Sequence, residues 1–123
     1  MKLLIAGSRT GIRKEVVFEI LDEEVDVSEL DEVVSGGARG VDAYGEQWAC
    51  HNNIDVTRFP ADWKQFGRKA GMIRNADMGR YSDALVAFWD GKSKGTEHMI
   101  KVMNDLKKPT IVIHVTNGEP EDE

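Results

Sequence analysis

The stretch Ser35-Gly36-Gly37-Ala38-Arg39-Gly40-Val41-Asp42 decides how the rest of the chain can be arranged. Apolar Val33 and Val34 precede it and apolar residues at helical spacing follow it, which predicts a strand that turns through three glycines into a helix. Glycine lets a ligand approach the backbone closely, and the free N–H groups at a helix start favour an anion. The stretch is therefore either a phosphate loop or a tight turn that only requires flexible residues.

Short apolar strands alternate with amphipathic helices on both sides of this stretch. We predict strands at 2–6, 31–35, 54–59, 83–89 and 110–115, and helices at 11–24, 41–52, 71–81 and 96–106. This alternation is typical of βαβ units. The predicted fold is α/β: a three-layer domain with a mainly parallel sheet of about five strands and helices on both faces. We expect one domain over residues 1–116 and an acidic, flexible tail at 117–123.

Some single residues carry narrower expectations. Met72 and Leu106 fall on the apolar sides of their predicted helices, and Cys50 is most simply a small core or interface residue that has no partner for a disulfide. Residues 60–71 are aromatic, basic and broken by glycine, and we expect them to form a functional loop. The three histidines lack ligand spacing, so we expect no metal and no cofactor.

The composition, 41% hydrophobic and 31% charged, is that of a globular protein, and no apolar run approaches the ~20 residues of a membrane span. We therefore expect a cytoplasmic protein that does not contact a membrane. The net charge of −6 argues against nucleic acid as a partner. Residues 58–80 nevertheless carry six bases and two acids, either as a site for an anionic ligand or as a solvated helix face.

Three polar loops would meet at one edge of the predicted sheet. They follow the first, second and fourth strands and contain Gly7-Ser8-Arg9, the 35–42 stretch, and Asp90 with Gly95-Thr96. Ligands of open parallel sheets bind at this carboxyl edge, so the loops predict a phosphate-bearing ligand. The G-x-G-x-x-G spacing is absent, and Val86 stands where a P-loop requires glycine, which excludes ordinary dinucleotide oxidoreductases and P-loop NTPases.

Taken together, four motifs resemble the YspA-like, cpYpsA-related branch of the SLOG superfamily. They are Gly7-Ser8-Arg9, the 35–42 stretch with Trp48-Ala49, Gly71-Met72-Ile73-Arg74-Asn75 with Met78, and Gly95-Thr96 after the fourth strand. The superfamily includes the LOG phosphoribohydrolases and the Rossmann-like domain of DprA. The resemblance covers residues 2–115 and implies a Rossmann-like domain that binds a nucleotide or nucleotide-derived ligand, in a homo-oligomer such as a dimer or tetramer.

LOG enzymes carry a P-G-G-x-G-T-x-x-E loop whose glutamate serves N-glycosidic cleavage, assisted by an arginine from the preceding helix. Gly95-Thr96 match the G-T, and Arg74 is the candidate arginine, but Met99 stands at the glutamate position and the Pro-Gly-Gly is absent. Cleavage of a ribosyl bond needs a carboxylate. Asp90 is one possible source, and we take Glu97 and Asp42 as the candidate catalytic residues.

These observations leave three hypotheses. The first is a binding module, such as a sensor or regulator, with Trp63 or Trp89 near the base. Its ligand-binding residues would be Gly7, Ser8, Arg9, Ser35, Gly36, Gly37, Ala38, Arg39, Gly40, Asp42, Arg74, Asn75, Asp90, Gly95 and Thr96, with Arg9, Arg39 and Arg74 on phosphate. The second is a nucleoside-5′-monophosphate phosphoribohydrolase or other N-glycosidase. The third is single-stranded DNA binding of the DprA type, which the acidic charge disfavours.

Overall fold

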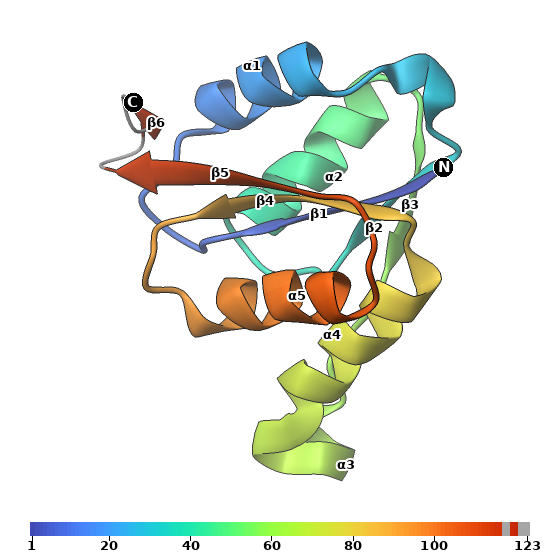
Figure 1. The fold of residues 1–123 in the computed structure, drawn as a ribbon, viewed down its shortest axis with the longest axis vertical. Coiled ribbons are helices and arrows are strands. Elements are labelled where there is room, and N and C mark those ends of the chain that lie inside the picture. The colour runs from blue at the N-terminus through green and yellow to red at the C-terminus, as the bar shows by residue number, and fades with distance from the viewer. Residues whose placement is uncertain (117–118, 121–123) are drawn as a thin grey trace.

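A computed structural model describes residues 1–116 and 119–120, which form one sheet covered by helices on both faces (Figure 1). The strands are β1 (Lys2–Gly7), β2 (Glu32–Ser35), β3 (Asp55–Arg58), β4 (Ala84–Trp89), β5 (Thr110–Thr116) and β6 (Glu119–Pro120). The helices are α1 (Lys14–Glu24), α2 (Val41–His51), α3 (Trp63–Phe66), α4 (Ala70–Tyr81) and α5 (Lys94–Asp105), with short 3-10 turns η1 (Val27–Glu29) and η2 (Gly67–Lys69).

The strand order in the sheet is β3-β2-β1-β4-β5-β6. The first five strands are parallel, and β1 lies between β2 and β4. The chain therefore builds outward from β1 in one direction through β2 and β3, and then returns to the other side of β1 with β4. Neighbouring connections diverge at this switch between β1 and β4, which leaves room for a ligand at the carboxyl ends of the two strands.

Each face of the sheet packs against its own pair of helices. On one face, β1 residues such as Leu3 and Ile5 contact apolar residues of α1 and α2, and Trp48 is fully buried there. On the other face, Leu4 and its neighbours contact α4 and α5 through methionines. The nearly continuous apolar runs of β1 and β4 follow from this double coverage, because their side chains are buried on both faces.

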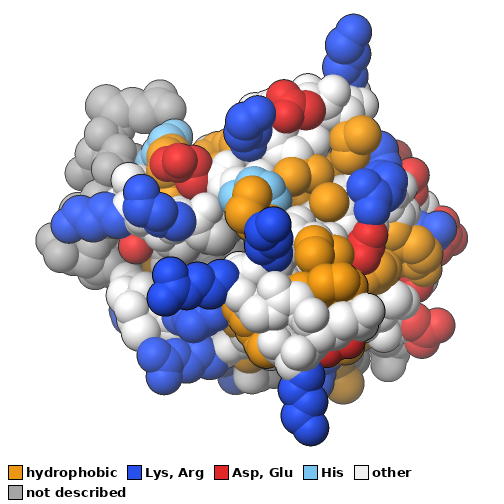
Figure 2. All heavy atoms as spheres, turned by 90° about the horizontal axis from the view of Figure 1, so that it is seen from below, with side chains coloured by type: hydrophobic (Ala, Val, Ile, Leu, Met, Phe, Trp, Pro, Cys, Tyr) orange, Lys and Arg blue, Asp and Glu red, His pale blue; other side chains and the backbone are white. Residues whose placement is uncertain are grey.

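The segment 60–71, predicted as a loop, is partly helical. Asp62 accepts a hydrogen bond from the Gln65 amide at 3.1 Å and so begins α3, and Gly67 ends it with a φ of +57°. We call residues 62–72 the α3 knob. Figure 1 shows it extending beyond the sheet, and Figure 2 views the molecule from this end.

The exposure of three single residues and the first residues of two helices differ from what the sequence predicted. Met72 is 58% exposed because it lies in the first turn of α4, which is part of the α3 knob, and Leu106 is 41% exposed because α5 ends before it. Cys50 is exposed instead of filling the core. Helix α1 begins three residues later than predicted, after Gly11 with its φ of +83°, and α5 begins two residues earlier.

The predicted tail at 117–123 falls mostly outside the described residues. Within it, Glu119–Pro120 form β6, an antiparallel neighbour of β5 that the sequence pattern did not predict. In the part of the chain that the structure describes, none of the helices has the length and apolar character that crossing a membrane requires.

Candidate functional site

A cleft of about 370 Å³ opens at the switch between β1 and β4. The three predicted loops meet there, together with the middle of α4. Its lining consists of Ala6, Gly7, Ser8, Arg9, Thr10, Ala38, Asp42, Arg74, Asn75, Met78, Asp90, Ser93, Gly95, Thr96 and Met99. Ten of the predicted ligand-binding residues therefore line one cleft: Gly7, Ser8, Arg9, Ala38, Asp42, Arg74, Asn75, Asp90, Gly95 and Thr96, the last two on the first turn of α5.

Other predicted residues lie behind this lining or away from it. Ser35, Gly36, Gly37 and Gly40 shape the loop between β2 and α2 without lining the cleft, and Arg39 is exposed outside it. Glu97 is also exposed and does not line the cleft. The two tryptophans expected near a base do not line the cleft either: Trp63 is exposed on the α3 knob, and half-buried Trp89 donates from its indole N–H to the Ser93 carbonyl.

Gly36 brings the glycine loop against the two charged groups of the cleft. A Cβ atom at this position would lie 2.9 Å from Asp42 Oδ2 and 3.0 Å from Arg74 Nη1. Glycine is therefore required here for close approach. The Arg74 guanidinium donates from Nη1 to the Gly36 carbonyl at 2.9 Å, and Asp42 Oδ2 accepts from the Ala38 amide at 3.3 Å. Both contacts hold the loop against α2 and α4.

Asp42 is a buried carboxyl on the first turn of α2, only 8% exposed. Burial raises its pKa to about 6, although the Ala38 amide and the Arg74 charge oppose the shift. Arg74 itself has a lowered pKa, first because it is half-buried and further because Arg9 lies nearby, while Asp42 acts in the opposite direction. The site thus holds a carboxyl that changes protonation close to neutral pH beside two arginines.

Asn75 connects Arg74 to the start of α5. Its Oδ1 accepts from Arg74 Nε at 3.0 Å, and its Nδ2 lies 3.3 Å from the Gly95 carbonyl oxygen and 3.1 Å from His98 Nδ1. Because arginine is only a donor, Oδ1 must face it and Nδ2 must donate to the other two groups. His98 Nδ1 is then an acceptor. Burial, followed by the charge of Lys101, lowers the pKa of His98, in agreement with a neutral ring.

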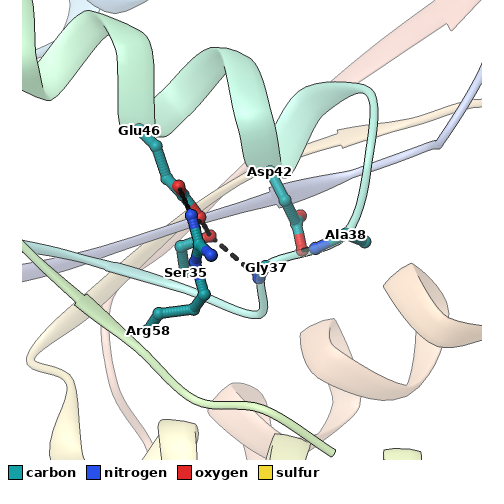
Figure 3. A network of polar contacts seen from close by, with 6 residues as sticks. All are labelled: Ser35, Gly37, Ala38, Asp42, Glu46 and Arg58. Carbon is teal, nitrogen blue, oxygen red and sulfur yellow. Dashed lines mark hydrogen bonds and ion pairs between the residues drawn. The ribbon is translucent and has the colours of Figure 1, made fainter.

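A second network fixes the glycine loop from the other side (Figure 3). Glu46 on α2 accepts from the Ser35 hydroxyl at 2.6 Å and from Arg58 Nε at 3.1 Å, and Ser35 Oγ accepts from the Gly37 amide at 3.0 Å. Burial opposes ionisation of Glu46, but the Arg58 and Ser35 hydrogen bonds together hold its pKa below the usual value. Ser35 thus supports the glycine loop, and its role as a ligand group stays a prediction.

The loop after β4 places the start of α5 at the cleft. Asp90 Oδ1 accepts from the amides of Lys92 and Ser93, at 2.8 and 2.7 Å, and these bonds hold its pKa below the usual value. Ser93 is the N-cap of α5, but its hydroxyl contacts the Thr96 hydroxyl at 3.1 Å and caps no amide. The first amide N–H groups of α5 therefore have no side-chain partner among the described residues.

Ser8 brings a hydroxyl to the cleft beside the Asp90 carboxyl. The residue is 3% exposed and lines the cleft, and its Oγ makes no hydrogen bond of ordinary geometry to any residue that the structure describes. It lies close enough to the Asp90 carboxyl to lower the pKa of that group further. A buried hydroxyl without a partner costs free energy, so a ligand atom would stabilise it.

Sequence reasoning missed several residues that build this cleft. Thr10, Met78 and Met99 line it, and Glu46 and Arg58 support its loop. The two methionines are apolar, so their residue type does not indicate a binding role. Both lie on the side of their helix that packs on the sheet, and residues there near the carboxyl edge form the floor of a site. Within the described ranges, no group of three or more His, Cys, Asp or Glu side chains could hold a metal ion.

Comparison with known proteins identifies the family. The sequence model of the YspA, cpYpsA-related SLOG family matches residues 1–66. The Gene 61 protein of Mycobacterium phage D29 is 35% identical over an alignment of 117 positions, which covers 89% of this chain and 94% of that protein. The chain belongs to the YspA, cpYpsA-related SLOG family. The resemblance drawn from the four sequence motifs is thereby confirmed.

Two solved DprA structures share the fold of this SLOG protein. DprA from Streptococcus pneumoniae has a TM-score of 0.72 at 15% identity, and the match covers 94% of this chain and 50% of that one. DprA from Helicobacter pylori, described as having a unique single-stranded DNA binding mode, has a TM-score of 0.64 at 19% identity, with 98% and 68% covered. The SLOG chain thus spans half the length of the first. At these identities the likeness concerns the fold, and it confirms the predicted Rossmann-like α/β architecture.

Proposed function

We propose that this SLOG protein binds a nucleotide or nucleotide-derived ligand in the cleft between β1 and β4, with a phosphate at the start of α5. One observation carries the proposal: the free Ser8 hydroxyl, the Arg74 guanidinium and the uncapped first turn of α5 converge on one cleft. Each of the three is a donor suited to an anionic oxygen. The cleft volume of about 370 Å³ lies within the range of small-molecule sites, about 300–1,000 Å³.

The carboxylates of the cleft favour a nucleotide over a bare phosphate. Asp90, whose lowered pKa keeps it ionised, uses Oδ1 for two amides, which leaves Oδ2 as an acceptor for a ribose hydroxyl. Asp42, with its pKa raised to about 6, is partly neutral near that pH and repels a phosphate less than an ordinary aspartate would. Donors for phosphate and an acceptor for a hydroxyl therefore lie in the same cleft.

The proposal is tested by titrating AMP, NAD, ADP-ribose, adenosine and inorganic phosphate into the protein, with calorimetry and thermal shift as readouts. We expect the phosphate-bearing nucleotides to bind more tightly than adenosine, and the Arg74→Gln variant to lose this advantage. Arg80→Gln is the matched control, because Arg80 lies on the same helix, outside the cleft, paired with Asp77. Equal binding of AMP and adenosine, or full binding by Arg74→Gln, would contradict the proposal.

A second candidate function, N-glycosidic hydrolysis, is favoured by Asp42 alone. A buried carboxyl with a pKa of about 6 inside a cleft can exchange a proton with a substrate near neutral pH. Glu97, the other candidate, is exposed and outside the cleft lining. The test is release of base from AMP: hydrolysis that Asp42→Asn abolishes and Glu97→Gln leaves intact would support it. Absence of base release from the wild type would exclude it for this substrate.

We also propose single-stranded DNA binding, because the chain shares its fold with DprA. The Helicobacter pylori protein is described as binding single-stranded DNA, which weakens our expectation that the acidic charge excludes nucleic acid as a partner. Salt-dependent retention of a single strand is the test. The homo-oligomeric state, the cytoplasmic location and a role as a sensor or regulator stay predictions.

A further inference from the structure

The α3 knob, residues 62–72, exposes large apolar side chains away from the cleft. Trp63 is 57% exposed, Phe66 40% and Met72 58%. The knob packs mainly against the rest of α4, and its path is set by the Asp62 cap and by Gly67. None of these three side chains lines the cleft. Exposed large apolar side chains gathered on one segment mark a binding surface more often than a structural element.

Trp63 packs against α4 on one side, and more than half of the residue is exposed to solvent. A Cβ atom placed on Gly71 would lie 3.6 Å from Cη2 of the Trp63 ring, which is ordinary van der Waals contact. The indole thus packs against the first turn of α4. A ring held in this way loses little conformational freedom when a flat ligand stacks on its open face.

Three cations surround these apolar side chains. Lys64, Arg68 and Lys69 are exposed and form no ion pair or side-chain hydrogen bond with the residues that the structure describes. Asp62, the acid of the knob, is engaged with the Gln65 amide. Figure 2 shows lysine and arginine side chains around hydrophobic ones on this end of the molecule. A chain with a net charge of −6 therefore concentrates unpaired positive charge beside exposed aromatic rings.

We propose that the α3 knob binds single-stranded nucleic acid, with bases stacked on Trp63 and Phe66 and phosphates held by Lys64, Arg68 and Lys69. Aromatic rings interleaved with cations match the alternating flat bases and charged phosphates of an unpaired strand. A duplex hides its base faces inside the stack and fits this surface poorly. A second copy of the chain, docking through its acidic α1, is the competing occupant. The proposal does not depend on nucleotide binding in the cleft, because the two surfaces share no lining residue.

The test is fluorescence anisotropy with labelled dT15 and U15 between 25 and 200 mM salt, and with a duplex of the same length. With three phosphate contacts, the slope of log K against log salt is expected to be about −2. Trp63→Ala should weaken binding roughly five- to one-hundredfold, and Trp63→Phe should retain most of it. The matched controls are Lys101→Gln on α5 and Leu106→Ala just after it; both residues are exposed and distant in the chain from the knob, and both variants should bind normally.

Several results would overturn the proposal. The first three are no binding of dT15 at 25 mM salt, equal affinity for the single strand and the duplex, and an equal loss of affinity in Leu106→Ala. The fourth is a Trp63→Ala variant that changes the sedimentation of the protein and binds the strand normally, which would assign the knob to contact with a second copy. Arg74→Gln separates the two surfaces: it should lose AMP and keep dT15, and Trp63→Ala should do the reverse. If Arg74→Gln loses dT15 as well, the strand lies in the cleft and the knob is not its site.

Discussion

Arg74 on α4 donates from Nη1 to the carbonyl oxygen of Gly36 at 2.9 Å. This bond joins the glycine loop after β2 to a helix that begins 34 residues after Gly36, and it fixes the guanidinium at the cleft. Asn75 accepts from Nε of the same side chain, so the charged group is held from two sides. The cation that we propose for phosphate binding is therefore positioned before any ligand arrives.

Arg74→Lys should weaken nucleotide binding even though it keeps the charge. A lysine ammonium is a point charge that cannot bridge the Gly36 carbonyl and Asn75 Oδ1 in the planar geometry of the guanidinium. We expect a loss of about 1–2 kcal/mol in binding free energy, roughly tenfold, by calorimetry with AMP or ADP-ribose. Arg80→Lys on the same helix should bind as the wild type does. Retention of full affinity by Arg74→Lys would show that charge alone acts here.

Two glycine variants distinguish a steric clash within the protein from a steric clash with the ligand. Gly95→Ala adds a Cβ with no atom of the described residues within 4 Å, so the melting temperature should stay unchanged or rise while nucleotide affinity falls. Gly36→Ala places a Cβ 2.9 Å from Asp42 Oδ2 and should lower both, with about 1–3 kcal/mol lost in stability. Gly71→Ala, whose Cβ would make an ordinary contact with Trp63 outside the cleft, serves as the control. Unchanged affinity in Gly95→Ala would place the ligand away from α5.

Asp42→Asn should stabilise the protein at neutral pH. The folded carboxyl has a pKa of about 6 against 3.8 for the ordinary group, so between these values the unfolded chain ionises first and stability falls as pH rises. The free energy of unfolding of the variant should exceed that of the wild type by roughly 2–3 kcal/mol at pH 7.5 and by little at pH 4. Denaturant titrations of both proteins at the two pH values measure this. A gap independent of pH would show that Asp42 ionises normally.

Binding of NAD should weaken as pH rises from 5 to 7.5. The phosphodiester groups of NAD keep their charge over this range, so the titrating group is the protein's. A phosphate near Asp42 favours its protonated form, and ionisation of Asp42 through its pKa of about 6 should lower the affinity severalfold. Asp42→Asn should abolish the dependence. Tighter binding at higher pH would mean that the ionised carboxylate itself holds the ligand.

The fold was predictable because its signals are local and strong. β1 and β4 are almost wholly apolar, and glycine-rich turns mark where the strands end, so the alternation of strands and helices and the meeting of three loops followed from the sequence. The supporting residues were not predictable in this way. Glu46 on α2 and Arg58 on β3 carry ordinary charged-residue signals, and only the side-by-side packing of β2 and β3 brings Arg58 to the loop. The shape of the α3 knob was missed because its helix is a single turn set by Asp62 and Gly67.

A crystal structure of the protein with bound ADP-ribose or AMP tests the central claim most directly. We predict a phosphate within hydrogen-bonding distance of Arg74 and of an amide at the start of α5, with the Ser8 hydroxyl donating to the ligand and the Gly36 contact of Arg74 preserved. A phosphate bound elsewhere, or a cleft that stays empty at saturating nucleotide, would contradict the assignment of the cleft as the ligand site.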